Sequence, residues 1–121
     1  MQSTKKIWDT GEVVAIKYLQ KKWYIIKTSN FKFSRFWEID IIAEKNWITI
    51  FFEVKYRVGT KFGLPEEAIT KSKLRKSKRT IDYYCVKNNI DFEKIRFDVI
   101  AIVKNQTSYR LTHYKNISIS L

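Results

Sequence analysis

The chain has 121 residues, of which 45% are hydrophobic and 16% aromatic, and it carries a formal net charge of +12 at pH 7. These values fit one globular domain and exclude an intrinsically disordered chain. The single cysteine, Cys85, excludes a disulfide framework, and the single histidine, His113, excludes a zinc site built from cysteine and histidine.

The charge and the lack of long apolar stretches bear on the partners of the chain. The sequence has no apolar segment of the kind that a signal peptide needs, and no run approaching the ~20 apolar residues that span a bilayer. We therefore expect a cytoplasmic protein with no membrane partner. A positive charge attracts polyanions such as DNA and RNA, although an AT-rich genome would also enrich lysine without any ligand.

The first half of the chain predicts one helix and then three extended segments. The helix is expected over about residues 10–22, with Glu12 on the same face as its apolar side chains. Three β-rich segments follow, at residues 23–28, 38–44 and 47–55. The basic, aromatic stretch 30–37 is expected to be a loop or a strand edge. A turn at Lys45 and Asn46 would join the last two strands into a hairpin.

The second half predicts one long helix and two further strands. Residues 56–64 hold two of the three glycines and are expected to form a loop. Pro65 suits the start of a helix over about 66–89, whose acids come first and whose cations come later. The strands are expected over 95–104 and about 108–119. This order predicts an α/β fold with a mixed sheet flanked by helices.

We treat residues 1–121 as a single domain, with its core at about 9–104 and a C-terminal strand at about 108–119.

Three charged residues lie in otherwise apolar strands. Asp40 sits between isoleucines, and Glu53 and Lys55 lie near the end of a strongly apolar segment. Residues two apart on a strand point to the same face, so Glu53 and Lys55 project together. In the predicted hairpin, Asp40 lies one or two cross-strand steps from Glu53. We expect two acids and one amine to form a cluster.

Such a cluster suits Mg²⁺ or Mn²⁺, because these ions take carboxylate oxygens and keep several waters. Asp40 and Glu53 would bind the metal, which activates a bound water, and Lys55 would orient that water or stabilise charge on a phosphate. Glu12, on the helix face that packs on the sheet, is a candidate further ligand. The alternative is a solvated Glu53–Lys55 ion pair, with Asp40 as a charge that discourages edge pairing.

Five motifs in order resemble a known family. They are Glu12-x2-Ala15-x3-Leu19, EIDIIA at 38–43, FEVKYR at 52–57, PEEA at 65–68 with Lys73, and RFDVIAI at 96–102. Together they resemble the YraN-like, or UPF0102, family of predicted bacterial endonucleases. That family is similar to archaeal Holliday junction resolvases and falls in the PD-(D/E)xK nuclease superfamily. The resemblance covers about residues 11–102.

The resemblance implies a restriction-endonuclease-like αβββαβ core and a metal-dependent DNA endonuclease (a hydrolase). Asp40 matches the first metal-binding acid, Glu53 the second, Lys55 the catalytic lysine and Glu12 the helix acid that completes many such sites. The implied substrate is branched or flapped DNA, or DNA with single-stranded regions, in repair or recombination. Resolvase-like folds often form twofold dimers, so a homodimer is a natural arrangement.

Three residues are not explained by this assignment. Trp23 and Trp37 stand where the family frequently has glycine, and their rings are expected to narrow the substrate approach or alter a turn. For Asp98 we expect a structural role, accepting hydrogen bonds from Arg96 or from a backbone amide.

A basic segment on the second helix predicts a DNA-binding surface. Six cations fall within nine residues, and two more precede them: Arg57, Lys61, Lys71, Lys73, Arg75, Lys76, Lys78 and Arg79. We interpret them as a track for DNA phosphates. The alternative is a solvated helix whose long stems cover apolar surface. The neighbouring aromatics Phe31, Phe33, Phe36 and Trp37 would stack on unpaired bases or pack in the core.

Two rival functions remain open from the sequence. One is a noncatalytic DNA-binding accessory protein on the same fold, which would bind DNA in EDTA without cutting it. The other is a structural RNA-associated protein, an interpretation that rests on charge alone.

Overall fold

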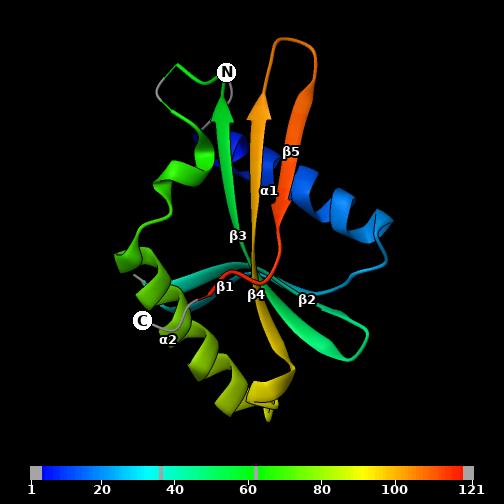
Figure 1. Ribbon diagram of the computed structural model, residues 1–121, viewed down its shortest axis with the longest axis vertical. Coiled ribbons are helices and arrows are strands. Elements are labelled where there is room, and N and C mark those ends of the chain that lie inside the picture. The colour runs from blue at the N-terminus through cyan, green and yellow to red at the C-terminus, as the bar shows by residue number, and fades with distance from the viewer. Residues whose placement is uncertain (1–3, 36, 62, 119–121) are drawn as a thin grey trace.

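The chain folds as a five-stranded mixed sheet with one long helix packed on each face (Figure 1). The computed structural model describes residues 4–35, 37–61 and 63–118. The elements in chain order are α1 (Thr4–Lys21), β1 (Ile25–Ser34), β2 (Trp37–Lys45), β3 (Ile48–Val58), the 3-10 turn η1 (Pro65–Ala68), α2 (Lys71–Asn88), the 3-10 turn η2 (Phe92–Lys94), β4 (Ile95–Lys104) and β5 (Tyr109–Tyr114). The predicted α/β class is confirmed.

The strand order in the sheet is β1-β2-β3-β4-β5. Only β3 and β4, among the described strands, pair in parallel, because α2 carries the chain back across the sheet between them. The other neighbours are antiparallel, and β2 and β3 form the predicted hairpin. This order matches the αβββαβ core with an additional edge strand, β5.

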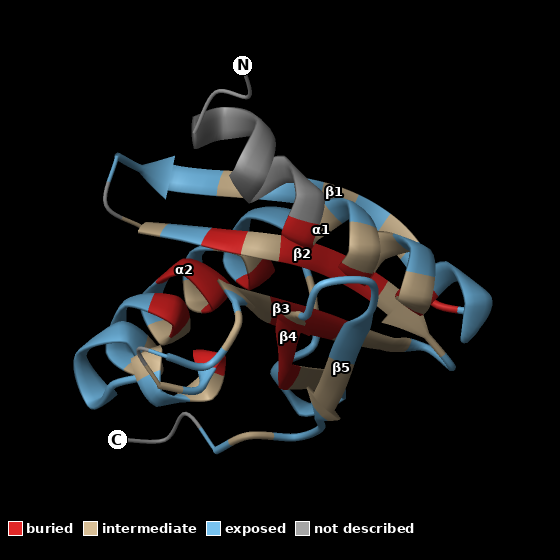
Figure 2. Cartoon of the chain, turned by 90° about the horizontal axis from the view of Figure 1, so that it is seen from above, coloured by how far each residue is buried: buried red, intermediate tan, exposed pale blue. Residues whose placement is uncertain are grey.

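Alternation along the strands divides the core between the two helices. Phe52 faces α1, where Ala15 and Leu19 are fully buried. Its neighbour Phe51 faces the opposite side and packs with Ile81 of α2. Successive strand residues point to opposite faces, so an apolar run buried on both faces needs a helix on each. Figure 2 shows buried residues along the strands and on the inward sides of both helices.

The bounds of the first helix and the first strand differ from the sequence-based expectation. The first helix starts at Thr4 rather than near Thr10. Of the two expectations for residues 30–37, the strand edge is confirmed and the loop is wrong for most of the stretch, because the edge strand β1 continues to Ser34 and pairs with β2 as far as Trp37. The aromatic side chains of this stretch pack beside a partner strand, and this packing favours a strand even though the stretch also contains polar residues.

The long helix expected over 66–89 is broken in two. η1 ends at Ala68, and α2 starts only at Lys71. Thr70 separates them because its hydroxyl oxygen accepts a hydrogen bond from the backbone N–H of Lys73 at 3.2 Å, the geometry of a helix N-cap. The C-terminal strand is also shorter than expected, since β5 ends at Tyr114.

Two turns place tryptophan in a backbone conformation that favours glycine. After α1, the N–H of Trp23 donates to the carbonyl of Gln20 and that of Tyr24 to Leu19, the two hydrogen bonds of a Schellman cap, with Trp23 at φ +71°. The β2–β3 hairpin turns on Asn46 and Trp47, both at positive φ, as in a type I′ turn. Positive φ costs an L-residue roughly 1–2 kcal/mol.

Neither described helix is both long enough and apolar enough to cross a membrane.

Candidate active site

The sheet divides between β2 and β3. Their pairing runs from Lys45 opposite Ile48 to Ile41 opposite Phe52 and extends no further. Beyond that point β2 continues with β1 only, as far as Trp37, while β3 continues with β4. The two halves of the sheet therefore diverge (Figure 1). The next residues on either side of this fork are Asp40 and Glu53.

Asp40 is held at the fork by the backbone of β3. Its Oδ2 accepts a hydrogen bond of 2.7 Å from the N–H of Val54. Burial raises the pKa of Asp40 to about 8, and the nearby carboxylates of Glu53, Glu12 and Glu38 raise it too, against the Val54 hydrogen bond. An acid with this pKa is a site where a cation would be strongly stabilising.

Glu53 and Lys55 project from the same face of β3, as the sequence predicts. Lys55 Nζ lies 3.1 Å from Glu53 Oε1, and both side chains are nearly buried, at 14% and 13% exposed. Lys73 of α2 reaches the same oxygen at 3.5 Å. Burial and the neighbouring Lys73 lower the pKa of Lys55, against the opposing effect of Glu53. The solvated-pair alternative is wrong, because this pair is mostly enclosed.

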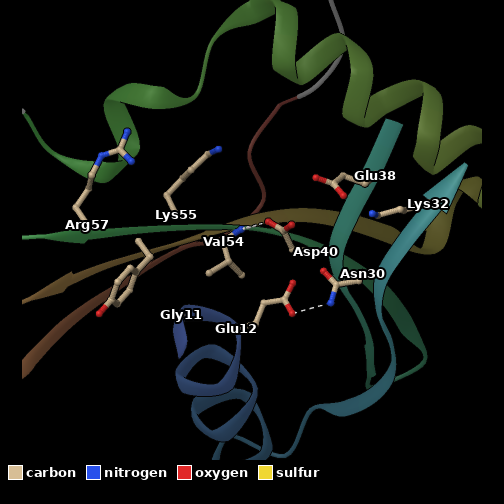
Figure 3. Close-up of a pocket in the computed structure, with 10 residues that line it drawn as sticks. Gly11, Glu12, Asn30, Lys32, Glu38, Asp40, Val54, Lys55 and Arg57 are labelled. Carbon is tan, nitrogen blue, oxygen red and sulfur yellow. Dashed lines mark hydrogen bonds between the residues drawn. The ribbon is translucent and has the colours of Figure 1, made fainter. Parts of the chain in front are cut away.

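Glu12 reaches the same region from α1, on the opposite side of the sheet from Lys55 (Figure 3). Its Oε2 accepts a hydrogen bond of 2.9 Å from Asn30 Nδ2 of β1. The preceding residue, Gly11, allows the helix to approach β3 closely, because an added Cβ there would lie 3.0 Å from Cβ of Tyr56. Glycine at this position thus sets the depth at which Glu12 enters the site.

Two neighbouring pockets contain these groups. The larger has a volume of about 340 Å³ and is lined by Gly11, Glu12, Asn30, Lys32, Glu38, Asp40, Val54, Lys55, Tyr56 and Arg57. The smaller, about 120 Å³, is lined by Glu38, Glu53, Lys73, Lys76 and Ser77. Asp40, Glu12 and Lys55 share the larger pocket (Figure 3). Glu53 lines the smaller pocket, and Glu38 lines both.

Three polar residues that line the larger pocket, Asn30, Lys32 and Glu38, were not assigned to the catalytic cluster from the sequence. Glu38 was within reach of sequence reasoning, since it lies two residues before Asp40 in the same strand. Asn30 and Lys32 fall in the stretch expected to be a loop or a strand edge, and only the pairing of β1 with β2 brings them to the site.

The predicted DNA-binding cations divide into two groups. Arg57, Lys73 and Lys76 line the pockets. Lys78 forms an ion pair with Asp82 at 3.1 Å along α2, and the guanidinium of Arg79 lies 5.5 Å from the ring centre of Trp37. The exposed residues Lys61, Lys71 and Arg75 lie outside both pocket linings.

The aromatic residues of β1 and β2 pack against α2. Phe33 stacks on Tyr83 with ring centres 4.0 Å apart and lies 5.1 Å from Trp37, while Phe31 meets Tyr84 edge-on. This favours the packing interpretation over base stacking for these rings. Phe36 lies outside the described residues.

Trp23 and Trp37 occupy different kinds of position. Trp23 lies at the end of α1 in a glycine-favouring turn, in line with the expectation that it alters a turn. Trp37 is paired with Ser34 in the β1–β2 ladder and begins β2. Neither residue is among those that line the two pockets of the described site residues.

Asp98 has the expected structural contacts. It is fully buried and accepts two hydrogen bonds of 2.9 Å from the guanidinium of Arg96. His113 Nε2 lies 2.7 Å from its Oδ2, and the backbone N–H of Asn116 donates to its Oδ1. Burial alone would raise its pKa, but these partners hold the pKa of Asp98 below its usual value.

The carboxylates of the described site do not form a complete metal cage by themselves. Within the described residues, no three acidic, histidine or cysteine side chains gather into a site able to hold an ion by themselves. Mg²⁺ is commonly held by one or two carboxylates, with water and substrate phosphate completing its shell. The chemistry of Asp40, whose pKa is raised partly by Glu53, fits such a two-carboxylate site.

Comparison with known proteins places this geometry in a family. The model of an uncharacterised protein family, UPF0102, matches residues 11–102, which include every residue of both pockets. The chain belongs to the UPF0102 family. This confirms the resemblance that the motifs carry.

Relatives in the family cover nearly the whole chain. A UPF0102 protein of Persephonella marina is 42% identical over 88% of this chain and 87% of its own length. One of Flavobacterium psychrophilum is 36% identical over the same shares. One of Alkaliphilus oremlandii is 39% identical over 93% of this chain and 97% of its own.

Proposed function

We propose that this UPF0102 protein is a Mg²⁺- or Mn²⁺-dependent endodeoxyribonuclease that hydrolyses phosphodiester bonds in branched or flapped DNA. The observation that carries the proposal is the position of Asp40. It lies where β2 and β3 separate, beside Glu53, and its pKa is raised by burial and by neighbouring acids. A carboxylate without a metal or catalytic role would be expected to lie in solvent or to pair with a cation.

Asp40 and Glu53 would hold the metal, with Glu12 as a further ligand or as a base for a bound water. The metal would polarise the scissile phosphate and lower the pKa of a bound water, so that the water could lose a proton and attack the phosphorus as hydroxide. The carboxylate of Glu12 faces the same pocket from α1, where it already accepts a hydrogen bond from Asn30. That hydrogen bond would fix its orientation toward a water.

Lys55 would orient the attacking water and stabilise negative charge on the phosphate. Burial lowers the pKa of Lys55, and its ammonium contacts Glu53 directly. When a cation binds the acids, Lys73 can continue to neutralise Glu53 from the α2 side, at 3.5 Å. Lys55 is then available to the substrate.

The cations beside the two pockets would bind the DNA backbone. Arg57 lines the larger pocket, and Lys76 lines the smaller one. Contacts to phosphates are independent of sequence and weaken steeply with salt. Two such subunits in a twofold dimer would cut both strands of a junction symmetrically.

The noncatalytic accessory function has two observations in its favour. Glu53 is held by two lysines, and the described residues contain no cage of three metal-binding side chains. A binding protein on this fold would keep the basic surface and lose the metal.

Cleavage assays separate the two functions. Labelled duplex, single-stranded, flap and four-way DNA are incubated with Mn²⁺ or with EDTA, and binding is measured in parallel. Metal-dependent cutting that favours the branched substrates supports the nuclease. Tight binding in EDTA with no cutting in Mn²⁺ supports the accessory protein instead. Preference for RNA over DNA of the same shape would overturn both.

A further inference from the structure

Two tryptophan rings stand in solvent at one end of the sheet. Trp23 is 83% exposed and Trp47 is 86% exposed. Each ring lies in a turn between two elements. Trp23 lies between α1 and β1, and Trp47 lies between β2 and β3. Large exposed apolar groups that lie close together are typical of interaction surfaces rather than of stability.

Both rings occupy positions where glycine is the ordinary choice. Trp23 is the left-handed residue of a Schellman cap, at φ +71°, and Trp47 is the second residue of a type I′ hairpin turn, at φ +68°. A bulky residue at positive φ is an outlier. Two independent turns accept this strain and also leave their rings unburied. Such local strain without a packing gain indicates a binding role.

The two turns are joined to each other. Lys45, which precedes the hairpin turn, donates a hydrogen bond of 2.7 Å from Nζ to the carbonyl of Lys22, the residue before Trp23. The same ammonium lies 4.6 Å from the ring centre of Tyr24. The register agrees, since Ile25 pairs with Glu44. Trp23 and Trp47 therefore flank a common surface, with Lys45 between them.

The charge around this surface is mostly positive. The contacts place two lysines here, Lys45 and Lys22, whose side chain and carbonyl, respectively, are hydrogen-bonded to each other, and Lys21 precedes Lys22 in the chain. Glu44, the neighbour of Lys45 in β2, is paired with Lys27 at 3.1 Å. The turn η2 adds Glu93 and Lys94, and the acid Asp91 caps its first turn. Exposed indoles among lysines suit unpaired nucleotides, whose bases stack on the rings while their phosphates meet the ammonium groups.

We propose that Trp23 and Trp47, with Lys22 and Lys45, bind the unpaired strand of a nucleic acid. That the nucleic acid is DNA rests on the proposed function. The inference adds that the unpaired strand is the part of the substrate that this surface recognises. Trp23 lies 11 residues beyond Glu12 along α1, roughly 16 Å at the helical rise and about five base steps of a strand. The surface would hold the unpaired arm of a branch while the pockets contact the backbone nearer the junction.

The test uses variants that suit the backbone better than the native residues do. Trp23→Gly and Trp47→Gly relieve the positive φ, so the melting temperature should stay the same or rise. In EDTA and low salt, the double variant should bind a labelled 20-nucleotide thymidine strand at least tenfold more weakly than the native protein. Its affinity for a blunt duplex should change less than threefold.

Two control variants identify the interaction. Trp23→Phe with Trp47→Phe should retain much of the affinity for the single strand, because phenylalanine still stacks, whereas the pair of leucine substitutions should lose it. Tyr109→Ala removes an exposed aromatic from β5, opposite Lys104 at the other end of β4, and should have no effect.

Several results would overturn the proposal. Unchanged affinity for the single strand in the double glycine variant would do so. Tight binding of the native protein to phosphatidylglycerol vesicles would also overturn it, if the double glycine variant loses this binding but still binds the oligonucleotide. So would a native dimer that dissociates in the double glycine variant while oligonucleotide binding persists. Failure of the proposed nuclease function is distinct, since it appears as no cutting in Mn²⁺ even if single-strand binding depends on both tryptophans.

Discussion

The Oδ2 atom of Asp40 accepts a hydrogen bond of 2.7 Å from the backbone N–H of Val54, two residues beyond Phe52, the last residue of β3 that pairs with β2. A side chain thus satisfies a strand N–H near the point where the neighbouring strand departs. The carboxylate is fixed by the main chain, and its surroundings raise its pKa to about 8. The Val54 hydrogen bond therefore holds the carboxyl group of Asp40 in place, while its burial and the neighbouring acids oppose its ionisation.

The first prediction concerns stability. In EDTA, Asp40→Asn should stabilise the fold by about 2 kcal/mol or more near pH 8. The unfolded acid loses its proton near pH 4, whereas the folded one keeps it until about pH 8. Stability of the native protein should therefore fall as pH rises through this window, and the variant should lack that decline.

Urea denaturation at several pH values measures this effect. Asp82→Asn is the matched control, because Asp82 is half-exposed on α2 and pairs only with Lys78 among the contacts described for it. It should change stability by less than about 0.5 kcal/mol. A destabilised Asp40→Asn protein at pH 8 would show that the site does not oppose ionisation of this acid.

The second prediction concerns metal. Millimolar Mn²⁺ should raise the melting temperature of the native protein, with a gain on the order of 1–3 kcal/mol at metal well above its Kd. The physical reason is relief of the repulsion between Asp40 and Glu53. Asp40→Asn should abolish most of this gain in a thermal-shift measurement. An equal shift in the variant would place the metal elsewhere on the molecule.

The third prediction concerns the DNA-binding cations. Lys76→Ala should weaken binding to duplex DNA several-fold and lower the salt slope by about 0.9, the value for one lost phosphate contact. Lys76 lines the pocket of Glu53, whereas the exposed Lys115 follows β5. Lys115→Ala removes the same charge and should have a smaller effect. DNA affinity is measured by titration from about 50 to 200 mM salt. An equal loss of affinity in the two variants would indicate that DNA responds to the overall positive charge and not to phosphate contacts at the pocket.

The fourth prediction concerns Asp98. Asp98→Asn should destabilise the protein by roughly 3–5 kcal/mol, because Arg96 loses its partner beside a buried position. The pKa of Asp98 is held below its usual value, so this stabilisation is present above about pH 4 and is lost as pH falls further. Acid titration followed by circular dichroism measures it. An unaltered acid transition in the variant would contradict this role.

Much of the site was predictable from local patterns. The alternation of apolar residues sets the register of the β2–β3 hairpin, and this register alone brings Asp40 close to Glu53. The spacing of Glu53 and Lys55 fixes their common face. These are contacts within one hairpin, where sequence separation is short and the period of a strand decides which side chains meet.

The remainder depends on long-range packing that no local pattern encodes. Asn30 and Lys32 enter the site only because β1 extends along β2. The angle of α2 brings Lys73 to Glu53, and the break at Thr70 sets where that helix begins. The turn residue Trp47 was expected in a strand, because its β propensity hides its positive φ.

The rate of DNA cleavage by two site variants, beside the native protein and one control variant, tests the central claim most directly. The native protein, Asp40→Asn, Lys55→Ala and Asp82→Asn are purified identically and incubated with labelled four-way and flap DNA in Mn²⁺. The account predicts cutting by the native and Asp82→Asn proteins and a loss of at least 100-fold in the other two, with DNA binding retained. Cutting by Asp40→Asn at the native rate would contradict it.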